Sequence, residues 1–216
     1  VRIYDWNGNT WIQRGIDIDG ENSEDKSGWS VVLSSDGNTV AIGAPFNDGN
    51  GTYSGHVRIY DWNGNTWIQR GNDIDVPTFY SFSYSGKSVS LSSDGNIIAI
   101  GSPGTGSDSG YVRLYDWNGS MWTQRGNDIA GESSYDESGY SVSLNSVGNR
   151  VAIGSPMNDG NGSNSGHVRI YDWNGNTWIQ IGTDIDGESI YDNSGFSISM
   201  CSNGNTHNPN LPFKAL

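Results

Sequence analysis

One connecting segment of the sequence, "VPTFYSFSYSG" at residues 76–86, holds four aromatic residues: Phe79, Tyr80, Phe82 and Tyr84. Exposed aromatic rings stack on sugars and bury against protein partners, so this segment could bind a glycan or a protein. The rings could instead fold down onto the protein itself. The counterpart segments elsewhere in the chain are near-copies of one another, and this one is longer and different. We therefore predict that Phe79, Tyr80, Phe82 and Tyr84 are the ligand-binding residues.

Carboxylates crowd the other long connections and could attract a cation. They are Asp19, Glu21, Glu24, Asp25, Asp48, Glu132, Asp136, Asp159, Asp186, Glu188 and Asp192. In Asp17–Asp25 ("DIDGENSED") and Asp184–Asp192 ("DIDGESIYD") the glycine is fourth, whereas an EF-hand loop has it sixth and ends on a bidentate Glu. We interpret these carboxylates as a solvated acidic rim that keeps the protein soluble. Calcium binding by these loops stays open as the alternative.

No combination of residues indicates catalysis. His56 and His167 take equivalent places in "SGHVR", and Tyr111 takes that place in another copy. A position that accepts either ring favours packing or hydrogen bonding over proton transfer. There is no nucleophile elbow, Cys–His pair or His-rich metal set, so we predict no catalytic residue, no metal ligand and no cofactor. The enzymatic alternative is a glycosidase or lyase, which needs two loop carboxylates within ~5–10 Å of each other around a cleft.

The charge of the chain excludes some partners. Its 216 residues carry a formal net charge of -13, which repels a phosphate backbone, so we predict no nucleic-acid partner. No stretch approaches the length of a membrane span, so we predict no membrane insertion by this segment. The single cysteine, Cys201, cannot close an intrachain disulfide. Val1 falls inside a repeated pattern, which favours flanking blades of a longer chain.

These residues belong to an internal repeat. The motif Val-Arg-(Ile/Leu)-Tyr-Asp-Trp-Asn-Gly begins at Val1, Val57, Val112 and Val168, so the copies are 56, 55 and 56 residues apart. The first copy has four alternating segments, at 1–6, 10–18, 28–34 and 39–45. Four antiparallel strands in a unit of this length are typical of a β-propeller blade.

Two kinds of connection separate the four segments. Asn7-Gly8 and Asp36-Gly37 are typical of two-residue type I′ hairpins, in which both central residues have positive φ. The other two connections are long, and in an up-and-down blade they lie together at one end. We predict that this long-loop face is the functional one.

The repeated tryptophans could bind a ligand or could pack inside the fold. A two-residue turn at Asn7-Gly8 sets Tyr4 opposite Trp11, and Tyr4, Trp6 and Trp11 then share one face of the sheet with aliphatic residues on the other. Two apolar faces fit a blade clamped between two others. We predict that the rings fill the wedge where blades splay apart, and that Trp6, Trp62 and Trp117 are buried.

The turn at Asp94-Gly95 predicts the inner part of the blade. It places Val89, Leu91, Ile98 and Ile100 on one side of the sheet and Ser88, Ser90 and Ala99 on the other. Small side chains suit inner strands, because blades converge on the axis of a propeller.

The segment "SGWSVVLSSDGNTVAIGAP" at 27–45 resembles the FG-GAP repeat, the blade type of integrin α-subunit propellers. Its two elements recur as Gly28-Trp29, Gly139-Tyr140 and Gly195-Phe196, and as Gly43-Ala44-Pro45, Gly101-Ser102-Pro103 and Gly154-Ser155-Pro156. The resemblance implies a propeller for adhesion or ligand binding outside the cell. Calcium-binding members carry a D-x-D-x-D-G-type loop, but the turns here have one carboxylate or none, so those calcium sites are not expected.

We therefore predict an all-β chain, a β-propeller of four-stranded antiparallel blades with about 55 residues per repeat, forming about four blades or part of a larger ring. Residues 1–200 are the repeats, with blade segments at about 1–18, 28–74, 85–129, 138–185 and 195–200, and 201–216 is an irregular tail. The predicted function is a non-enzymatic extracellular or cell-surface module for adhesion or ligand binding, with a protein or glycan ligand at the long-loop face. A purely structural spacer is the further alternative.

Overall fold

The described part of the chain, residues 1–76, 81–104 and 109–205 of a computed structural model, consists of β-strands and loops. The first strands are β1 (Tyr4–Trp6), β2 (Trp11–Gln13), β3 (Ser30–Leu33), β4 (Thr39–Ala44), β5 (His56–Trp62), β6 (Trp67–Gln69), β7 (Ile74–Asp75) and β8 (Ser88–Leu91). The others are β9 (Ile97–Ser102), β10 (Tyr111–Trp117), β11 (Trp122–Gln124), β12 (Ile129–Ala130), β13 (Ser141–Leu144), β14 (Arg150–Ser155), β15 (His167–Trp173), β16 (Trp178–Gln180) and β17 (Ile185–Asp186). No helix in these residues is long and apolar enough to cross a membrane.

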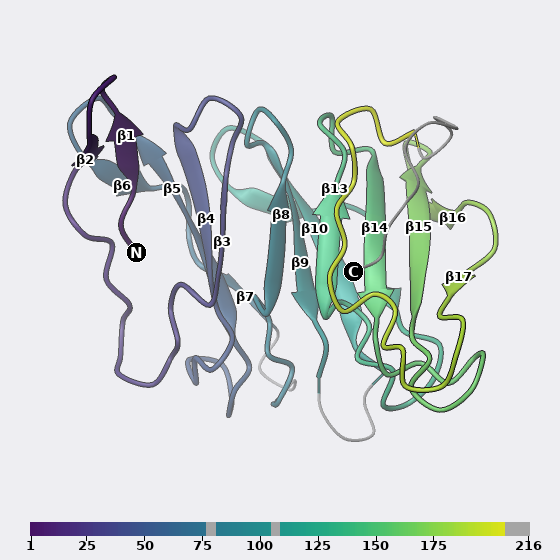
Figure 1. The fold of residues 1–216 in the computed structure, drawn as a ribbon. Helices are drawn as coiled ribbons and strands as arrows, with labels where there is room; N and C mark the ends of the chain where they lie inside the picture. The colour runs from purple at the N-terminus through teal and green to yellow at the C-terminus, as the bar shows by residue number, and fades with distance from the viewer. Residues whose placement is uncertain (77–80, 105–108, 206–216) are drawn as a thin grey trace.

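The strands form one two-stranded sheet, β1–β2, and three five-stranded antiparallel sheets, each of which is a blade. The sheets contain β3–β7, β8–β12 and β13–β17, and in the first of them the order is β3-β4-β5-β6. The inner strands β3, β8 and β13 contact one another in series, so the blades converge there and stand side by side (Figure 1). The predicted all-β fold of β-propeller blades is confirmed.

Each blade has four strand positions, and the outermost position is split in two. Both β6 and β7 pair with β5, with Trp67 opposite Trp62 and Ile74 opposite Val57. The chain between them bulges away from β5, and Gly71 there has a φ of 77°, which favours glycine. The continuous outer strand that the sequence predicts is therefore interrupted at its Arg-Gly step.

The outer hairpins differ from the predicted register. Trp6 pairs with Trp11, so the loop 7–10 has four residues and not two. The side chain of Asn7 accepts hydrogen bonds from two backbone N–H groups of this loop, at 2.9 and 2.8 Å. Gly8 has positive φ but Asn7 does not, so the predicted type I′ turn is wrong. The register shifts by two residues, and the predicted faces survive because side chains alternate with a period of two.

The inner hairpins keep the predicted register. Leu91 lies opposite Ile98, as expected from a turn centred on Asp94-Gly95. Ser92 donates its backbone N–H to the carbonyl of Ile97 at 2.9 Å, so the loop has four residues around that centre. Asp36, like Asp94, does not have positive φ, so the type I′ turn predicted at Asp36-Gly37 is wrong too.

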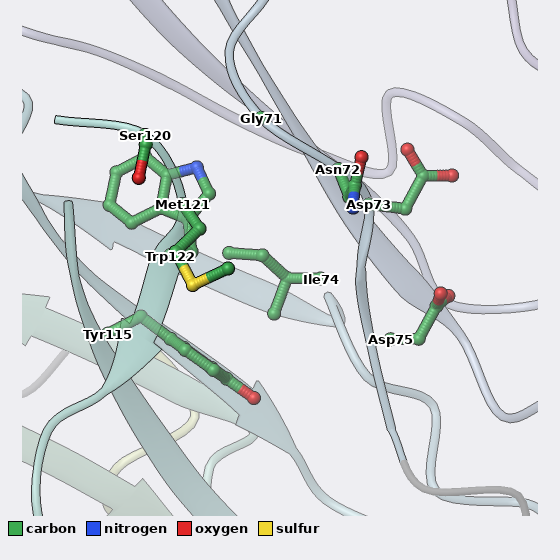
Figure 2. A pocket seen from close by; sticks show the side chains of 9 residues that line it. All are labelled: Gly71, Asn72, Asp73, Ile74, Asp75, Tyr115, Ser120, Met121 and Trp122. Atoms are coloured by element: carbon green, nitrogen blue, oxygen red, sulfur yellow. The ribbon is translucent and has the colours of Figure 1, made fainter. Parts of the chain in front are cut away.

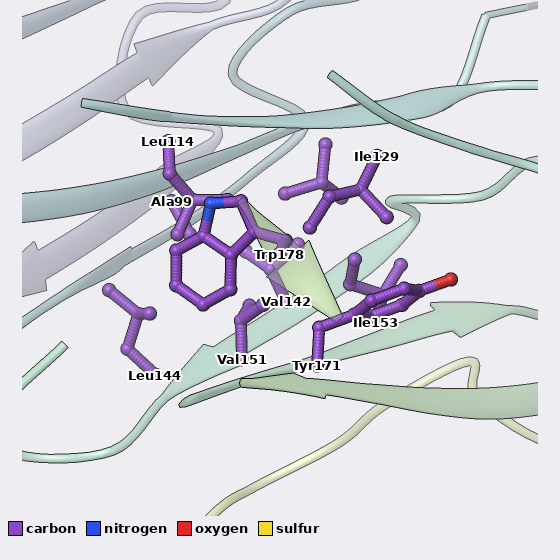
Figure 3. Packing of buried hydrophobic residues seen from close by; sticks show 10 residues of the cluster. Ala99, Leu114, Ile129, Val142, Leu144, Val151, Ile153, Tyr171 and Trp178 are labelled. Carbon is purple, nitrogen blue, oxygen red and sulfur yellow. The ribbon is translucent and has the colours of Figure 1, made fainter. Parts of the chain in front are cut away.

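The hydrophobic core lies between the blades and not within a single layer. Between the second and third sheets it consists of Ala99, Val112, Leu114, Ile129, Val142, Leu144, Val151, Ile153, Tyr171 and Trp178 (Figure 3). These residues come from both sheets, so each blade buries its faces against its neighbours. Burying one such aliphatic side chain contributes about 1.5–3 kcal/mol to stability.

Close backbone approach at the inner strands explains the two glycine elements of the repeat. A Cβ on Gly43 would lie 2.1 Å from the carbonyl oxygen of Gly86 in the next blade, so no larger residue fits there. Ser30 donates its hydroxyl to the same carbonyl at 2.7 Å. The same approach joins Gly101 to Gly139 and Gly154 to Gly195.

The tryptophan pairs of the second, third and fourth outer hairpins pack on the Arg-Gly step of the preceding copy. Trp67 donates its indole N–H to the carbonyl of Arg14 at 2.9 Å. The guanidinium carbon of Arg14 lies 4.9 Å from the ring centroid of Trp62. A Cβ on Gly15 would lie 2.8 Å from the ring of Trp62. The indole bond recurs between Trp122 and Arg70 and between Trp178 and Arg125, each at 3.0 Å.

These contacts answer whether the tryptophans bind or pack. Trp62 and Trp117 are half-buried between blades, as predicted for a wedge. Trp6 is 54% exposed, so the prediction is wrong there. The physical reason is that the described chain supplies no Arg-Gly step before the first hairpin.

The two ends of the row differ. At the N-terminal end, Val31 and Leu33 of β3 are exposed. At the other end, Ile198 and Met200 pack on the third blade, where the inner strand of a further blade would lie. In the described residues the β1–β2 hairpin pairs with no other strand, so the blades form an open row (Figure 1).

Replacing the glycine of the Arg-Gly step tests the inter-blade contact. Gly71→Ala adds left-handed strain of about 1–2 kcal/mol. Its Cβ would also lie 2.9 Å from the ring of Trp117, an overpacking that costs roughly another 1–3 kcal/mol. Gly182 has a similar φ, 72°, but nothing within 4 Å of its Cβ position. We expect Gly71→Ala to lose about 2–4 kcal/mol in urea unfolding and Gly182→Ala about half of that. Equal losses would contradict the proposed role of the contact.

Candidate functional site

The predicted aromatic segment runs alongside the loop that precedes β5. Phe82 and Tyr84 donate their backbone N–H groups to the carbonyls of Thr52 and Tyr53, at 2.7 and 3.0 Å. Tyr53, Phe82 and Tyr84 have φ values of 48°, 61° and 52°, which are uncommon for aromatic residues. The backbone bonds thus hold side chains of two loops at one place on the long-loop face.

The rings at this place form one group, which we call the aromatic cluster: Trp29, Phe46, Tyr53, Phe82 and Tyr84. Tyr53 and Tyr84 are stacked, with centroids 5.8 Å apart. Phe46 meets both of them edge-on, at 5.4 and 5.3 Å. Phe82 lies 5.9 Å from Tyr53, and Trp29 lies 5.8 Å from Phe46. Such rings present flat apolar surface with fixed orientation.

The structure brings two of the four predicted ligand-binding residues into the aromatic cluster. Phe82 is 45% exposed and Tyr84 is half-buried, so these two rings are neither fully exposed to solvent nor fully buried. Phe79 and Tyr80 lie outside the described residues. Trp29, Phe46 and Tyr53 were not predicted, although Phe46 and Tyr53 are aromatic residues at positions where the other copies have none.

A cavity of about 180 Å³ adjoins the aromatic cluster. It is lined by Phe46, Tyr84, Lys87, Pro103, Gly104, Glu137 and Tyr140. The ammonium nitrogen of Lys87 lies 4.2 Å from the ring centroid of Trp29 and 4.9 Å from that of Tyr140, as in cation–π contacts. Burial lowers the pKa of Lys87 and raises the pKa of Glu137, so the cavity offers a desolvated cation and a desolvated carboxyl beside aromatic rings.

The aromatic residues of the cluster are not required by the backbone conformation. The residues that stand in the place of Tyr84 in the other copies are Lys26, Glu137 and Asn193. All three have positive φ, as Tyr84 does. Because the same backbone conformation forms at this position with charged and amide side chains, the ring of Tyr84 is not needed to form the loop.

The predicted acidic rim is partly buried. Asp25 and Asp136 are 5% and 2% exposed, and the prediction that they are solvated is wrong. A carboxylate oxygen of Asp25 accepts a hydrogen bond from the amide of Asn47 at 2.9 Å, and Asp136 accepts one from Asn158 at 3.1 Å. These two carboxylates hold neighbouring loops together through hydrogen bonds, so their structural role is enough to explain why they are there.

The two equivalent histidines each meet two carboxylates. We call these groups the first triad, Glu21, His56 and Asp73, and the second triad, Glu132, His167 and Asp184. In each, one ligand atom per residue lies within 4.8 Å of the others. Both histidines are buried, and burial together with Arg169 lowers the pKa of His167. Neither triad was predicted from the sequence, because its members come from distant segments and match no known metal-binding motif.

A second cavity, of about 330 Å³, lies between the split outer strand of the first blade and the outer hairpin of the second. It is lined by Gly71, Asn72, Asp73, Ile74, Asp75, Tyr115, Ser120, Met121 and Trp122. Ile74 points toward Met121 and Trp122, and the carboxylates of Asp73 and Asp75 point away from them (Figure 2). Asp73 belongs both to this cavity and to the first triad.

Comparisons with known proteins agree with this architecture. A comparison with curated proteins finds no match. Among solved structures, a proposed 6-phosphogluconolactonase from Bacteroides uniformis ATCC 8492 is similar with a TM-score of 0.52 and 13% identity, over 81% of this chain and 44% of that one. The hydrazine synthase of Kuenenia stuttgartiensis is similar with a TM-score of 0.50 and 11% identity, over 88% and 43%.

The β-propeller domain of the Trilobed protease from Pyrococcus furiosus is similar with a TM-score of 0.41 and 10% identity, over 80% of this chain and 45% of that one. The chain therefore spans less than half the length of these solved structures. At such identities a likeness shows the fold alone.

Part of the chain also matches a known family of sequence repeats. The family model of the FG-GAP repeat matches residues 16–60, which run from the end of the first hairpin into β5. The Gly-Trp and Gly-Ala-Pro elements of the resemblance lie within this match. The chain is built of β-propeller blades, and its residues 16–60 match the FG-GAP repeat.

Proposed function

We propose that the chain is a non-enzymatic extracellular or cell-surface module that binds a glycan or protein ligand through its long-loop face. The observation that carries this proposal is the aromatic cluster with its adjoining cavity. All five of its positions are aromatic at one blade junction, while the equivalent positions at another junction are Tyr140, Met157, Asn164, Tyr191 and Asn193. Adhesion and an extracellular location rest on the resemblance to FG-GAP repeats.

The chemistry of the aromatic cluster suits a carbohydrate or a polypeptide segment. Flat rings bind the apolar face of a sugar or a proline-rich strand, and a few polar groups fix the orientation of the ligand. Lys87 and Glu137 provide a donor and an acceptor at the edge of the cavity. The acidic surface, with a net charge of -13, favours neutral or cationic ligands over polyanions.

A propeller glycosidase or lyase is the second candidate, because carboxylates do converge in the two triads. Hydrolysis needs both carboxyl groups to flank the substrate in one cleft. Asp73 lines the 330 Å³ cavity, but Glu21 is not among its lining residues. The arrangement therefore favours binding over hydrolysis.

The side chain of Tyr84 should be dispensable for folding. Tyr84→Asn loses ring contacts worth about 0.5–1.5 kcal/mol. Asparagine tolerates positive φ better than tyrosine, and Asn193 already stands in the equivalent position. We expect the free energy of unfolding, measured in urea, to fall by about 1 kcal/mol or less. Gly86→Ala is the contrast: its Cβ would lie 2.7 Å from the carbonyl oxygen of His56, and we expect a loss of more than about 2 kcal/mol. A Tyr84→Asn variant that fails to fold would mean that the aromatic cluster is structural.

Two equivalent exposed rings test the binding surface. Phe82 and Tyr191 occupy matching positions with φ values of 61° and 65°, but only Phe82 belongs to the aromatic cluster. A ligand found on a glycan array or by pull-down should bind Phe82→Asn at least about tenfold more weakly, a change of about 1.4 kcal/mol. Tyr191→Asn should bind it as the parent chain does. Equal binding by both variants, or turnover of the glycan, would refute the proposal.

A further inference from the structure

The two triads have the same construction in different blades. In each, the histidine begins the third strand of a blade, the aspartate lies in the split of the outer strand of that blade, and the glutamate comes from the connection that enters the blade. Nδ1 of His56 lies 3.8 Å from Oε2 of Glu21 and 3.7 Å from Oδ2 of Asp73. In the second triad the same separations are 3.9 and 3.7 Å. One arrangement thus occurs twice, 111 residues apart from His56 to His167.

Each carboxylate is oriented by a side chain that contacts the oxygen facing away from the histidine. Gln180 donates its amide to Oδ1 of Asp184 at 2.6 Å, which leaves Oδ2 facing His167. Arg169 lies 3.6 Å from Oε1 of Glu132, which leaves Oε2 facing the same imidazole. Supporting contacts of this kind are what fixes ligands around a metal ion.

The first triad is held in the same way. Gln69 donates to Oδ1 of Asp73 at 2.6 Å, and Arg58 lies 3.7 Å from Oε1 of Glu21. Oε2 of Glu21 also accepts a long hydrogen bond, 3.5 Å, from the amide of Asn47.

The separations suit a shared ion better than hydrogen bonds. An N–H···O bond has its heavy atoms 2.7–3.2 Å apart, so 3.7–3.9 Å is too long. Ligands at 2.0–2.2 Å from a tetrahedral Zn²⁺ lie about 3.4 Å from each other. Each imidazole–carboxylate separation would need to close by only a few tenths of an ångström around the ion, and the two carboxylate oxygens lie within 4.8 Å of each other.

The buried imidazole has no other function within the described residues. His167 is 1% exposed, and its Nε2 has no hydrogen-bond partner there. Its Nδ1 faces only the two carboxylates, beyond hydrogen-bond distance. A buried polar group without a partner costs about 1–3 kcal/mol. Coordination of an ion would give Nδ1 the partner that it lacks in the described residues, although it would not supply one for Nε2.

The second blade provides an internal contrast. Tyr111 stands in the place of the histidine, and the sequence has Pro77 in the place of Glu21. There the aspartate, Asp128, accepts hydrogen bonds from Arg113 on both oxygens, at 2.7 and 2.5 Å. Where the histidine is absent, the carboxylate therefore pairs with the arginine of its own blade.

We propose that each triad binds one divalent transition-metal ion, with Zn²⁺ as the best fit to one imidazole and two carboxylates. Three protein ligands leave a coordination position for water, as in open zinc sites. Each ion would link a loop that enters the blade to the middle and outer strands of that blade. The sites lie apart from the family's turn-borne calcium loops and are independent of ligand binding at the aromatic cluster.

The test is metal stoichiometry of the whole chain. After dialysis against Zn²⁺ and removal of free ion, we expect two zinc ions per chain by elemental analysis, and a higher Tm that falls when a chelator is added. His167→Tyr, which copies the second blade, should retain one ion, and His56→Tyr with His167→Tyr should retain none. His207→Gln changes the one histidine outside the triads and should retain two.

Two results would overturn the proposal. The first is a parent chain that binds no zinc at about 100-fold molar excess, and the second is a double variant that binds as much zinc as the parent. Glu132→Gln replaces a partly exposed carboxylate and guards against misfolding of the buried variants. We expect it to weaken zinc binding at the second triad at least about tenfold in calorimetric titration, and an unchanged isotherm would also refute the assignment.

Discussion

The structure depends on the contact between a tryptophan pair and the Arg-Gly step of the preceding copy. The indole N–H needs a carbonyl acceptor when it is buried, and the arginine carbonyl supplies it at 2.9 Å for Trp67. The guanidinium lies over the same rings and adds about 0.5–2 kcal/mol per contact. Glycine is obligatory at the next position because a Cβ would enter the ring. One dipeptide thus fixes the spacing of two blades.

This contact makes each blade dependent on its neighbour. Trp6 and Trp11 form the same ring pair as Trp62 and Trp67, with centroids 5.4 and 5.3 Å apart. They are nevertheless exposed, because no Arg-Gly step covers them. At the other end the fourth copy has Ile181 in place of the arginine, and Gly182 has open space around it. The contacts that stabilise the fold therefore lie at the junctions between neighbouring blades, as expected of repeat proteins.

The sequence was sufficient to predict the repeat, the four-stranded blade and the register of the inner hairpins. It was not sufficient where a side chain forms hydrogen bonds with the backbone and changes a loop. Alternation and turn signals predicted Leu91 opposite Ile98, because both depend on local pattern. The outer register failed because the Asn7 side chain accepts two backbone N–H groups and enlarges the loop. Phe82 and Tyr84 were predicted from an unusual composition. Tyr53, which stacks on Tyr84, joins them through backbone pairing between two loops, which no local pattern encodes.

The split outer strand connects the packing of the repeat to its chemistry. Arg70 and Gly71 receive the tryptophan pair of the next blade at the point where the chain leaves its regular pairing with β5. Having left it, the chain places Asp73 beside His56, with Gln69 holding its other oxygen. A strand that continued the register of Trp67 opposite Trp62 would set Asp73 directly opposite His56, and the split moves the pairing on by two residues, so that Asp75 lies opposite His56. In the third blade the same split places Asp184 beside His167 although nothing packs on Gly182, so the split of the outer strand, and not the tryptophan contact, positions this ligand.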